Sequence, residues 1–165
     1  MKPALLVIDI QKDFFNNSPT TAQLLNNAIE NINPVIALFR EKGLPVICVQ
    51  HMEPENGLVP GQEKYDLPDS LQILPSDLHI HKTYRNSFNK TPLAEKLAEM
   101  GVDTVFITGY CAQYCILSTI RGAMDLDLTP IVVKDCIAGD DPESVTFVEN
   151  IDDLITYGAL RKLLE

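Results

Sequence analysis

Apolar residues along this chain form short continuous runs that alternate with longer segments of helical spacing. The first run, Pro3 to Ile10 (PALLVIDI), is apolar except for Asp9. A short run of this kind predicts a strand that is buried on both faces of a parallel sheet. Similar runs predict further strands at residues 44–50, 102–109 and 129–134, and residues 78–82 predict a short strand that ends in Lys82.

Helical spacing is clearest between Thr20 and Lys42, with Gly43 as the predicted stop signal. Pro34 lies inside this segment, so we expect either a kink there or a later start of the helix. A second helix is predicted from Thr91, a suitable N-cap, to residue 100. Residues 114–126 predict a third, and residues 143–165 are mostly helical in pattern, with a possible short strand at 154–157.

The two remaining segments, His51 to Leu74 and Asp135 to Pro142, have the composition of loops, and the longer one is a candidate cover for a binding site. Strands that alternate with helices indicate βαβ units. We therefore predict an α/β protein: a three-layer α/β/α, doubly wound, Rossmann-like fold with a mainly parallel sheet of five or six strands. No repeat or linker is present, so residues 1–165 are expected to form a single domain.

Ligands of such sheets bind beyond the carboxyl ends of the strands, near a switch in strand order. The residues at the predicted strand ends are therefore candidate site residues, namely Asp9, His51, Lys82, Cys111, Cys115 and Asp135.

Three of these strand ends carry a carboxylate, an ammonium and a thiol: Asp9, Lys82 and Cys115. A cysteine at a strand end and helix start is placed where backbone N–H groups favour thiolate, and Lys82 would add to that effect. Asp9 would accept the thiol proton and return it to a leaving group. Equally, Asp9 and Lys82 can simply mark where strands reach water, and a single cysteine is often a small buried apolar residue.

The net charge of −10 argues against binding to nucleic acid or to anionic membranes. No apolar run approaches the roughly 18 residues of a spanning helix, and the first residues lack the pattern of a signal peptide. We therefore expect a cytoplasmic protein. The cysteines, which lack the paired spacing of zinc sites and disulfide frameworks, are Cys48, Cys111, Cys115 and Cys136.

Three blocks of sequence together resemble a known family. Residues 5–15 (LLVIDIQKDFF) are similar to a D-x-Q-x-D-F motif, and residues 82–93 (KTYRNSFNKTPL) to a K-x-x-x-S-x-F…T-x-L pattern. Residues 105–123 (VFITGYCAQYCILSTIRGA) resemble a G-x-x-T-x-x-C-V…T-x-x-A block that carries a nucleophile. In this order and spacing, the blocks resemble the isochorismatase-like cysteine hydrolases, which include nicotinamidases, N-carbamoylsarcosine amidases and ureidoacrylate amidases.

The resemblance implies Cys115 as nucleophile, Asp9 as base and then acid, and Lys82 as electrostatic partner. It also implies a cis peptide between Tyr110 and Cys111, with the N–H groups of Cys111 and Cys115 forming an oxyanion hole. The reaction implied is hydrolysis of a small amide, ureide or carbamoyl compound through a thioester. The resemblance implies no cofactor for this chain, and a homo-oligomer of at least two copies.

The chain departs from the family pattern in three places. Ala112 stands where the family usually has Thr, and Asn86 where Ser is common. After the second strand, His51 and Glu53 replace an Asp-x-His pair that binds metal in nicotinamidases. We therefore expect no metal site.

Several alternatives remain open from the sequence. One alternative is a catalytically weak or inactive binding or regulatory protein on the same scaffold, and another is a thiol redox sensor that uses Cys111 and Cys115. A phosphohydrolase with Asp9 as nucleophile would want a carboxylate two residues on, where this chain has Gln11. Candidate residues of the substrate pocket, which are as often the edge of a core, are Phe14, Phe15, His51, Tyr84, Phe88 and Tyr114.

Overall fold

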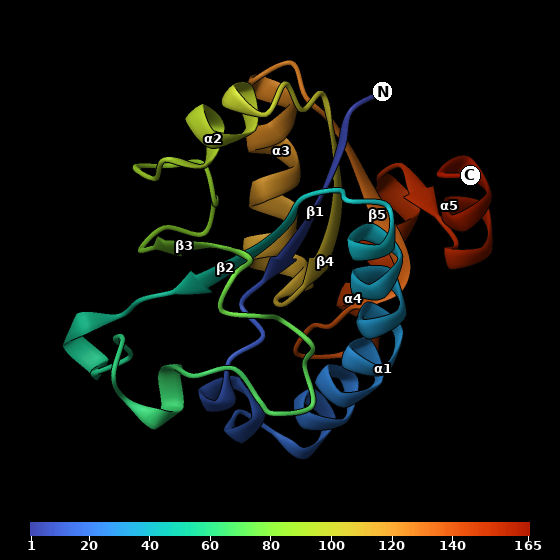
Figure 1. The fold of residues 1–165 in the computed structure, drawn as a ribbon. Helices are drawn as coiled ribbons and strands as arrows, with labels where there is room; N and C mark the ends of the chain where they lie inside the picture. Colours follow the sequence, from blue (N-terminus) through green and yellow to red (C-terminus); the bar gives the residue numbers. More distant parts are fainter.

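Six parallel strands form one sheet in the computed structural model, which describes residues 1–165 (Figure 1). The strand order is β3-β2-β1-β4-β5-β6, and every neighbouring pair is parallel. The strands are β1 (Pro3–Ile8), β2 (Val46–His51), β3 (Leu78–Lys82), β4 (Thr104–Gly109), β5 (Thr129–Ile137) and β6 (Leu154–Ile155).

The strand order reverses beside β1. The chain first moves outward through β2 to β3 and then crosses back to β4 on the other side of β1. Such a switch leaves a crevice beyond the carboxyl ends of the central strands, which is the usual ligand site of open parallel sheets. The predicted doubly wound fold is thus confirmed, and its crevice falls between the ends of β1 and β4.

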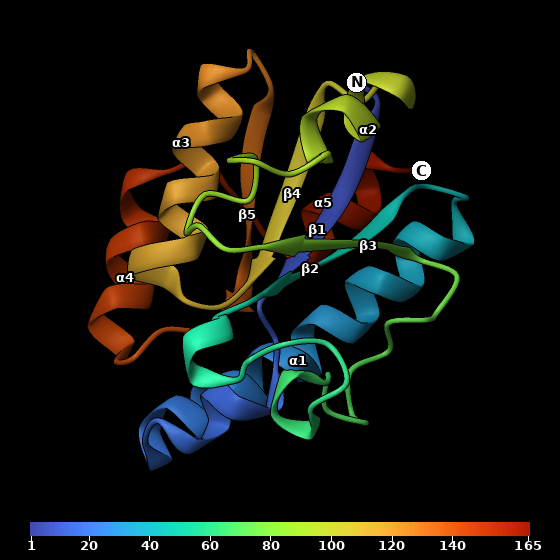
Figure 2. The same ribbon diagram turned by 90° about the vertical axis from the view of Figure 1, so that its left-hand side faces the viewer.

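Helices cover both faces of the sheet (Figure 2). One face packs against α1 and α5, and the other against α2, α3 and α4. The helices are α1 (Pro19–Glu41), α2 (Leu93–Glu99), α3 (Leu117–Asp125), α4 (Pro142–Ile151) and α5 (Tyr157–Leu163). None of them is long and apolar enough to cross a membrane.

The continuous apolar run of β1 follows from this double cover. Leu5 and Val7 belong to the core beneath α1, whereas Leu6 and Ile8 belong to the core beneath α2, α3 and α4. Because side chains alternate between faces, a strand covered on both sides needs apolar residues at every position.

Helix α1 starts earlier than one reading of its sequence predicted. Ser18 is the N-cap, and its hydroxyl accepts a hydrogen bond of 3.0 Å from the Thr21 N–H. The helix then continues through Pro34 to Glu41, so a later start is wrong. At its end Gly43 has φ of +65°, the left-handed conformation expected of a glycine stop.

Strand β5 is longer than predicted. It continues past Lys134 to Ile137, with a register shift against β4 between Ile107 and Gly109. Asp135 therefore lies within the strand, exposed and with φ of +64°, rather than at its end. The predicted helical tail with a short strand is confirmed by α4, β6 and α5.

Gly109 lies where β4 passes closest to β1. Its φ is +118°, and a Cβ atom there would lie 2.0 Å from the Ile8 carbonyl oxygen. We expect Gly109→Ala to lower the free energy of unfolding by about 3 kcal/mol, since it adds both overpacking and backbone strain. Urea denaturation measures this. Gly158→Ala is the control: Gly158 is helical with open space around it, so that variant should be as stable as the parent or slightly more so.

Candidate active site

Asp9 is the first residue beyond β1, and it turns the chain out of the sheet. Its φ is +55°, and its N–H donates a 2.8 Å hydrogen bond to the Val49 carbonyl. Aspartate tolerates this left-handed conformation better than most residues. The side chain is only 1% exposed, and the carboxylate lies beside the crevice.

Lys82 ends the edge strand β3 and is fully buried. Its Nζ lies 2.8 Å from Asp9 Oδ2, 2.9 Å from His51 Nδ1 and 3.4 Å from Cys115 Sγ. An ammonium has three N–H donors, so these three contacts account for all of them. The structure therefore brings together the three residues proposed from the strand ends, with Lys82 at the centre.

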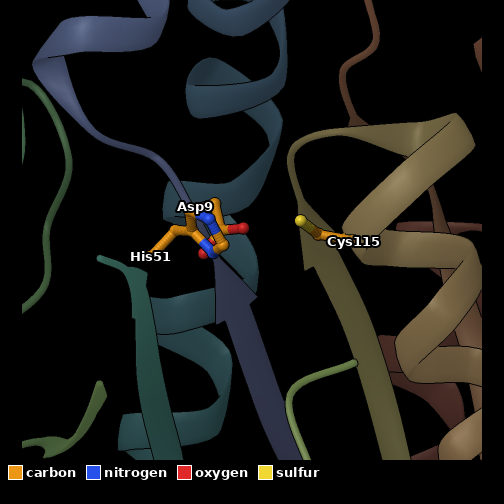
Figure 3. Close-up of side chains that lie close together, drawn as sticks. All are labelled: Asp9, His51 and Cys115. Atoms are coloured by element: carbon orange, nitrogen blue, oxygen red, sulfur yellow. The ribbon is translucent and has the colours of Figure 1, made fainter. Parts of the chain in front are cut away.

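Cys115 lies in a π-helical turn, Ala112–Ile116, that joins β4 to α3. The Cys111 carbonyl accepts hydrogen bonds from both the Tyr114 and the Ile116 N–H groups, at 3.0 and 3.1 Å. The Tyr110–Cys111 peptide that precedes this turn is cis. Figure 3 shows the Cys115 sulfur directed across the crevice toward Asp9 and His51, which lie on the neighbouring strands.

The Cys115 thiol is not held as a thiolate in this environment. Burial raises its pKa to about 12, with a further increase from the Asp9 carboxylate, and Lys82 only partly opposes this. Lys82 lowers the pKa of the thiol, as the sequence indicated, but burial and the Asp9 carboxylate have the larger effect. A nucleophilic role for this thiol would therefore require a base that takes its proton.

The Asp9 carboxylate is placed for that role. One of its oxygens contacts the Lys82 ammonium, and neither oxygen accepts a hydrogen bond from any other protein group. A buried carboxylate with free lone pairs is costly unless a donor reaches it. The Cys115 sulfur lies within 4.8 Å of a ligand atom of Asp9, so its thiol is a candidate donor to this carboxylate.

His51 is part of this cluster, although the sequence indicated only a pocket wall. Lys82 donates to its Nδ1, and Glu53 Oε1 lies 3.3 Å from its Nε2. Burial and the Lys82 charge lower the pKa of His51, so the ring is neutral with its proton on Nε2. Gln11 fixes its position: the Gln11 amide donates to the His51 carbonyl at 3.0 Å and accepts from its N–H at 2.7 Å.

Asp9, His51 and Cys115 offer three ligand atoms within 4.8 Å of one another, a spacing that suits a metal ion. The Lys82 ammonium contacts all three of these residues. A metal ion would have to displace or approach this buried positive charge, so the residues present fit an ammonium and do not fit a metal.

The cluster opens into a cavity of about 250 Å³, which suits a ligand smaller than a typical drug molecule. Three of the six predicted pocket residues line it: Phe14, His51 and Tyr114. The complete lining consists of Asp9, Phe14, Asn17, His51, Glu53, Arg85, Tyr110, Cys111, Tyr114, Cys115 and Asp140.

The other three predicted pocket residues lie elsewhere. Phe15 packs against the core beneath α1, and Phe88 against the core beneath α3. Tyr84 is 41% exposed, and its hydroxyl accepts a hydrogen bond from Lys90. The long segment 51–74 contributes only its first residues to the cavity, so its predicted role as a cover is wrong.

Four lining residues were missed from the sequence: Asn17, Glu53, Arg85 and Asp140. Asp140 is exposed, and it accepts hydrogen bonds from the Tyr110 hydroxyl at 2.6 Å and from the Gln113 amide at 2.9 Å. Asp140 lies just beyond the end of β5. The sequence indicated a shorter strand that ends at residue 134, so this position near a strand end was not recognised.

Cys111 also lines the cavity, with its thiol donating to Gln113 Oε1 at 3.0 Å. Burial and the Asp140 charge raise the pKa of this thiol to about 12. All four cysteines are free thiols.

The two departures from the family blocks have clear structural settings. Ala112 is fully buried in the apolar core beneath α3 and does not line the cavity. Asn86 packs so closely on Gly122 that a Cβ there would lie 2.4 Å from its Oδ1. Next to it, the Ser87 and Thr119 hydroxyls are hydrogen-bonded at 2.9 Å.

The family of the chain follows from its similarity to known proteins. Residues 3–154 match the isochorismatase domain model. The chain therefore belongs to the isochorismatase family.

Named relatives of the chain differ in what is known of them. It is 35% identical to the uncharacterized isochorismatase family protein YddQ of Bacillus subtilis, over 84% of this chain and 78% of that protein. It is 30% identical to a probable inactive nicotinamidase of Arabidopsis thaliana (94% and 89%) and 26% identical to a maleamate amidohydrolase of Pseudomonas putida (82% and 72%). An isochorismatase-like hydrolase structure from Alkaliphilus metalliredigens superposes with a TM-score of 0.88 at 22% identity, over all of both chains.

Proposed function

We propose that this protein is a cysteine-dependent hydrolase of a small amide, ureide or carbamoyl compound. One observation carries the proposal: a single buried ammonium, Lys82, contacts both the Asp9 carboxylate at 2.8 Å and the Cys115 sulfur at 3.4 Å, at the base of a small cavity. These are a base, a nucleophile and a charge that stabilises both of their ionised forms.

In the first step the Cys115 sulfur attacks the carbonyl carbon of the substrate. The S–C bond forms as the thiol proton moves to Asp9, which becomes a neutral acid, and Lys82 stabilises the thiolate character that develops on the sulfur as the proton leaves. The raised pKa of Cys115 requires this coupling, because little free thiolate exists near neutral pH.

The carbonyl oxygen becomes an oxyanion in this step. The Cys111 N–H has no acceptor in the protein, so it is free to donate to that oxygen. Together with the Cys115 N–H, it would form the oxyanion hole, and preorganised donors of this kind each contribute about 100- to 1000-fold to the rate.

Collapse of the intermediate breaks the C–N bond, and Asp9 returns its proton to the leaving nitrogen. Ammonia or an amine departs and leaves a thioester on Cys115. A water molecule then attacks the thioester carbonyl, Asp9 accepts a proton from the water, and the cysteine sulfur leaves and regains the proton. The products are an acid and an amine, and the enzyme is unchanged.

The test is a panel of small amides and ureides, read out as ammonia release. We expect the wild-type protein to hydrolyse at least one member and Cys115→Ala to fall to the rate without enzyme, since no other thiol meets both Asp9 and Lys82. Cys136→Ala is the matched control: this thiol is buried in the core away from the cavity, so activity should stay within a few-fold. Activity of Cys115→Ala equal to that of the wild type would contradict the proposal.

A second candidate is a binding protein on the same scaffold. The raised pKa of Cys115 favours it, and the relative from Arabidopsis thaliana bears the name of an inactive protein. No turnover across the panel, with saturable binding of the same compounds, would support this alternative. A redox sensor instead predicts a reversible Cys111–Cys115 disulfide, visible in the intact mass.

We further propose a cytoplasmic homo-oligomer. Four free thiols suit a reducing compartment, and α4 exposes apolar side chains that a second copy could cover, among them Phe147 (53% exposed) and Ile151 (45%).

A further inference from the structure

We propose that His51 is a positioning residue of the active site and acts through Lys82. Its Nδ1 holds the ammonium so that one N–H stays directed at the Cys115 sulfur and one oxygen of Asp9 stays free to take a proton. The roles of Cys115 and Asp9 rest on the proposed function, whereas the position of the ammonium can be tested without it. His51 itself forms and breaks no bond in the reaction described above.

Three acceptors of unequal strength surround the Lys82 ammonium, which is fully buried. Its Nζ lies 2.8 Å from the Asp9 carboxylate, 2.9 Å from His51 Nδ1 and 3.4 Å from the Cys115 sulfur. A carboxylate and an imidazole nitrogen accept hydrogen bonds strongly, whereas a thiol sulfur accepts them weakly. The two strong contacts therefore set the orientation of the ammonium, and the third N–H is left for the sulfur.

The Asp9 carboxylate offers the ammonium a competing position. Asp9 Oδ2 contacts Lys82, and Oδ1 is buried and accepts no hydrogen bond from the protein. Without His51, one N–H of Lys82 would be a buried donor that lacks an acceptor, which is unfavourable. The ammonium would then shift onto both oxygens of the carboxylate. That shift would draw positive charge away from the sulfur and occupy the oxygen that takes the thiol proton.

Glu53 determines which ring nitrogen of His51 accepts. Glu53 Oε1 lies 3.3 Å from Nε2, and an ionised carboxylate only accepts hydrogen bonds, so the ring proton lies on Nε2 and the lone pair on Nδ1. Burial and the Lys82 charge lower the pKa of His51, which keeps the ring neutral. Both nitrogens are thus engaged within the protein, and neither is free to bind a substrate.

The fold fixes the ring relative to the ammonium. His51 ends β2, Lys82 ends β3, and the two residues are register partners in the sheet. Gln11, which is fully buried, holds the backbone of His51 at both its N–H and its carbonyl, at 2.7 and 3.0 Å. Figure 3 shows the ring beside Asp9, and their ligand atoms lie within 4.8 Å of each other. A residue that orients another group needs such a fixed position.

The experiment compares His51→Asn with His51→Leu, two replacements of nearly the same shape. The asparagine oxygen can accept from Lys82 in place of Nδ1, whereas leucine offers no acceptor. Alkylation of Cys115 by iodoacetamide is measured at one alkaline pH by peptide mass spectrometry. We expect His51→Leu to react about tenfold more slowly than the wild type, because a neighbouring charge changes the thiolate population by at least that factor. His51→Asn should stay within a few-fold of the wild type.

His79→Leu is the matched control. It removes an imidazole from the neighbouring strand β3, but His79 contacts the Leu74 carbonyl and does not line the cavity. Alkylation of Cys115 in this variant should therefore equal that of the wild type.

His51→Ala covers the case in which leucine prevents folding. Alanine leaves the space of the ring open to the cavity that His51 lines. Imidazole at millimolar concentration should speed the alkylation of Cys115 in this variant, because it restores the acceptor. Pyrrole, a ring of the same size without an acceptor nitrogen, should not.

Hydrolysis gives a further readout on any substrate that the wild type turns over. His51→Leu should lower kcat by about 10- to 100-fold and leave KM nearly unchanged, since misplacing a group at the reacting centre has effects of this size on the chemical step. His51→Asn should recover most of kcat. A purely structural role of the ring would instead lower kcat in both variants alike.

Three results would each overturn the role of His51: equal alkylation of His51→Asn and His51→Leu, unchanged alkylation in His51→Leu, or equal effects of imidazole and pyrrole on His51→Ala. These readouts need no turnover, so they separate the two proposals. A protein whose alkylation follows the expected order but that hydrolyses no amide keeps the positioning role and loses the proposed reaction. A protein that hydrolyses amides equally well with histidine, asparagine or leucine at position 51 does the reverse.

Discussion

Replacing Asp9 by asparagine is expected to lower amide hydrolysis about a thousandfold while making the Cys115 thiol easier to alkylate. The two effects have one cause. The Asp9 carboxylate raises the pKa of the thiol, so removing its charge leaves the sulfur beside an unopposed Lys82 ammonium. The same change removes the base that carries the proton to the leaving group.

The measurement is a pH series of iodoacetamide labelling at Cys115, followed by peptide mass spectrometry, alongside ammonia release. In the wild type, labelling should still rise at the most alkaline pH that the protein tolerates, because the pKa of the thiol is about 12. In Asp9→Asn the profile should shift to lower pH. Asparagine is a suitable replacement since it also tolerates the left-handed backbone at this position.

Asp13→Asn serves as the control for that experiment. It removes a carboxylate from the same motif, but Asp13 does not line the cavity, so both profiles should resemble the wild type. A labelling profile in Asp9→Asn that stays in place or moves to higher pH would contradict the assigned electrostatics. Hydrolysis within tenfold of the wild type would contradict the role of Asp9 as base.

Lys82→Met should lower the free energy of unfolding by about 3–5 kcal/mol and abolish hydrolysis. Lys82 and Asp9 are both buried, and loss of the ammonium leaves the Asp9 carboxylate without its only partner. The Asp9 carboxylate must then either stay charged without solvent or take up a proton, and both cost free energy in the folded state. Urea denaturation measures the loss, provided that the slope of the transition is unchanged.

Two further variants make that result diagnostic. Lys96→Met breaks an exposed pair with Glu99 and should change stability by less than about 1 kcal/mol. The double variant Asp9→Asn with Lys82→Met leaves neither charge buried, so it should be more stable than Lys82→Met alone. If the double variant instead loses as much free energy of unfolding as Asp9→Asn and Lys82→Met lose together, the buried ion pair is not the source of the instability of Lys82→Met.

The sequence was sufficient to predict the sheet and the residues at the centre of the site. The central strands β1, β2 and β4 are nearly continuous apolar runs, so the charge of Asp9 directly after β1 stands out. Lys82 is recognised instead by its position at the end of the shorter strand β3. Parallel strands bring such ends to one edge, and the switch in order places β1 beside β4, where Cys115 follows. These inferences need only periodicity and topology.

The walls of the cavity were harder to predict, because they depend on where irregular segments return. Tyr84 and Arg85 are adjacent in the sequence. Arg85 lines the cavity, whereas the Tyr84 hydroxyl lies outside it and accepts a hydrogen bond from Lys90. The segment that carries both residues is joined to α3 by the hydrogen bonds of Ser87 to Thr119, a contact across 32 residues that no local pattern indicates. Lys82 lowers the pKa of Cys115 as the sequence indicated, but the larger opposite effect of burial depends on the packed structure and has no signal in the sequence.

The bond between Ser87 and Thr119 has a consequence for the site itself. It connects the segment that follows Lys82 to α3, the helix that follows the turn of Cys115. Lys82 and Cys115 are therefore joined by a second path, outside the sheet. A Ser87→Ala variant would loosen that path and leave every group of the cluster unchanged.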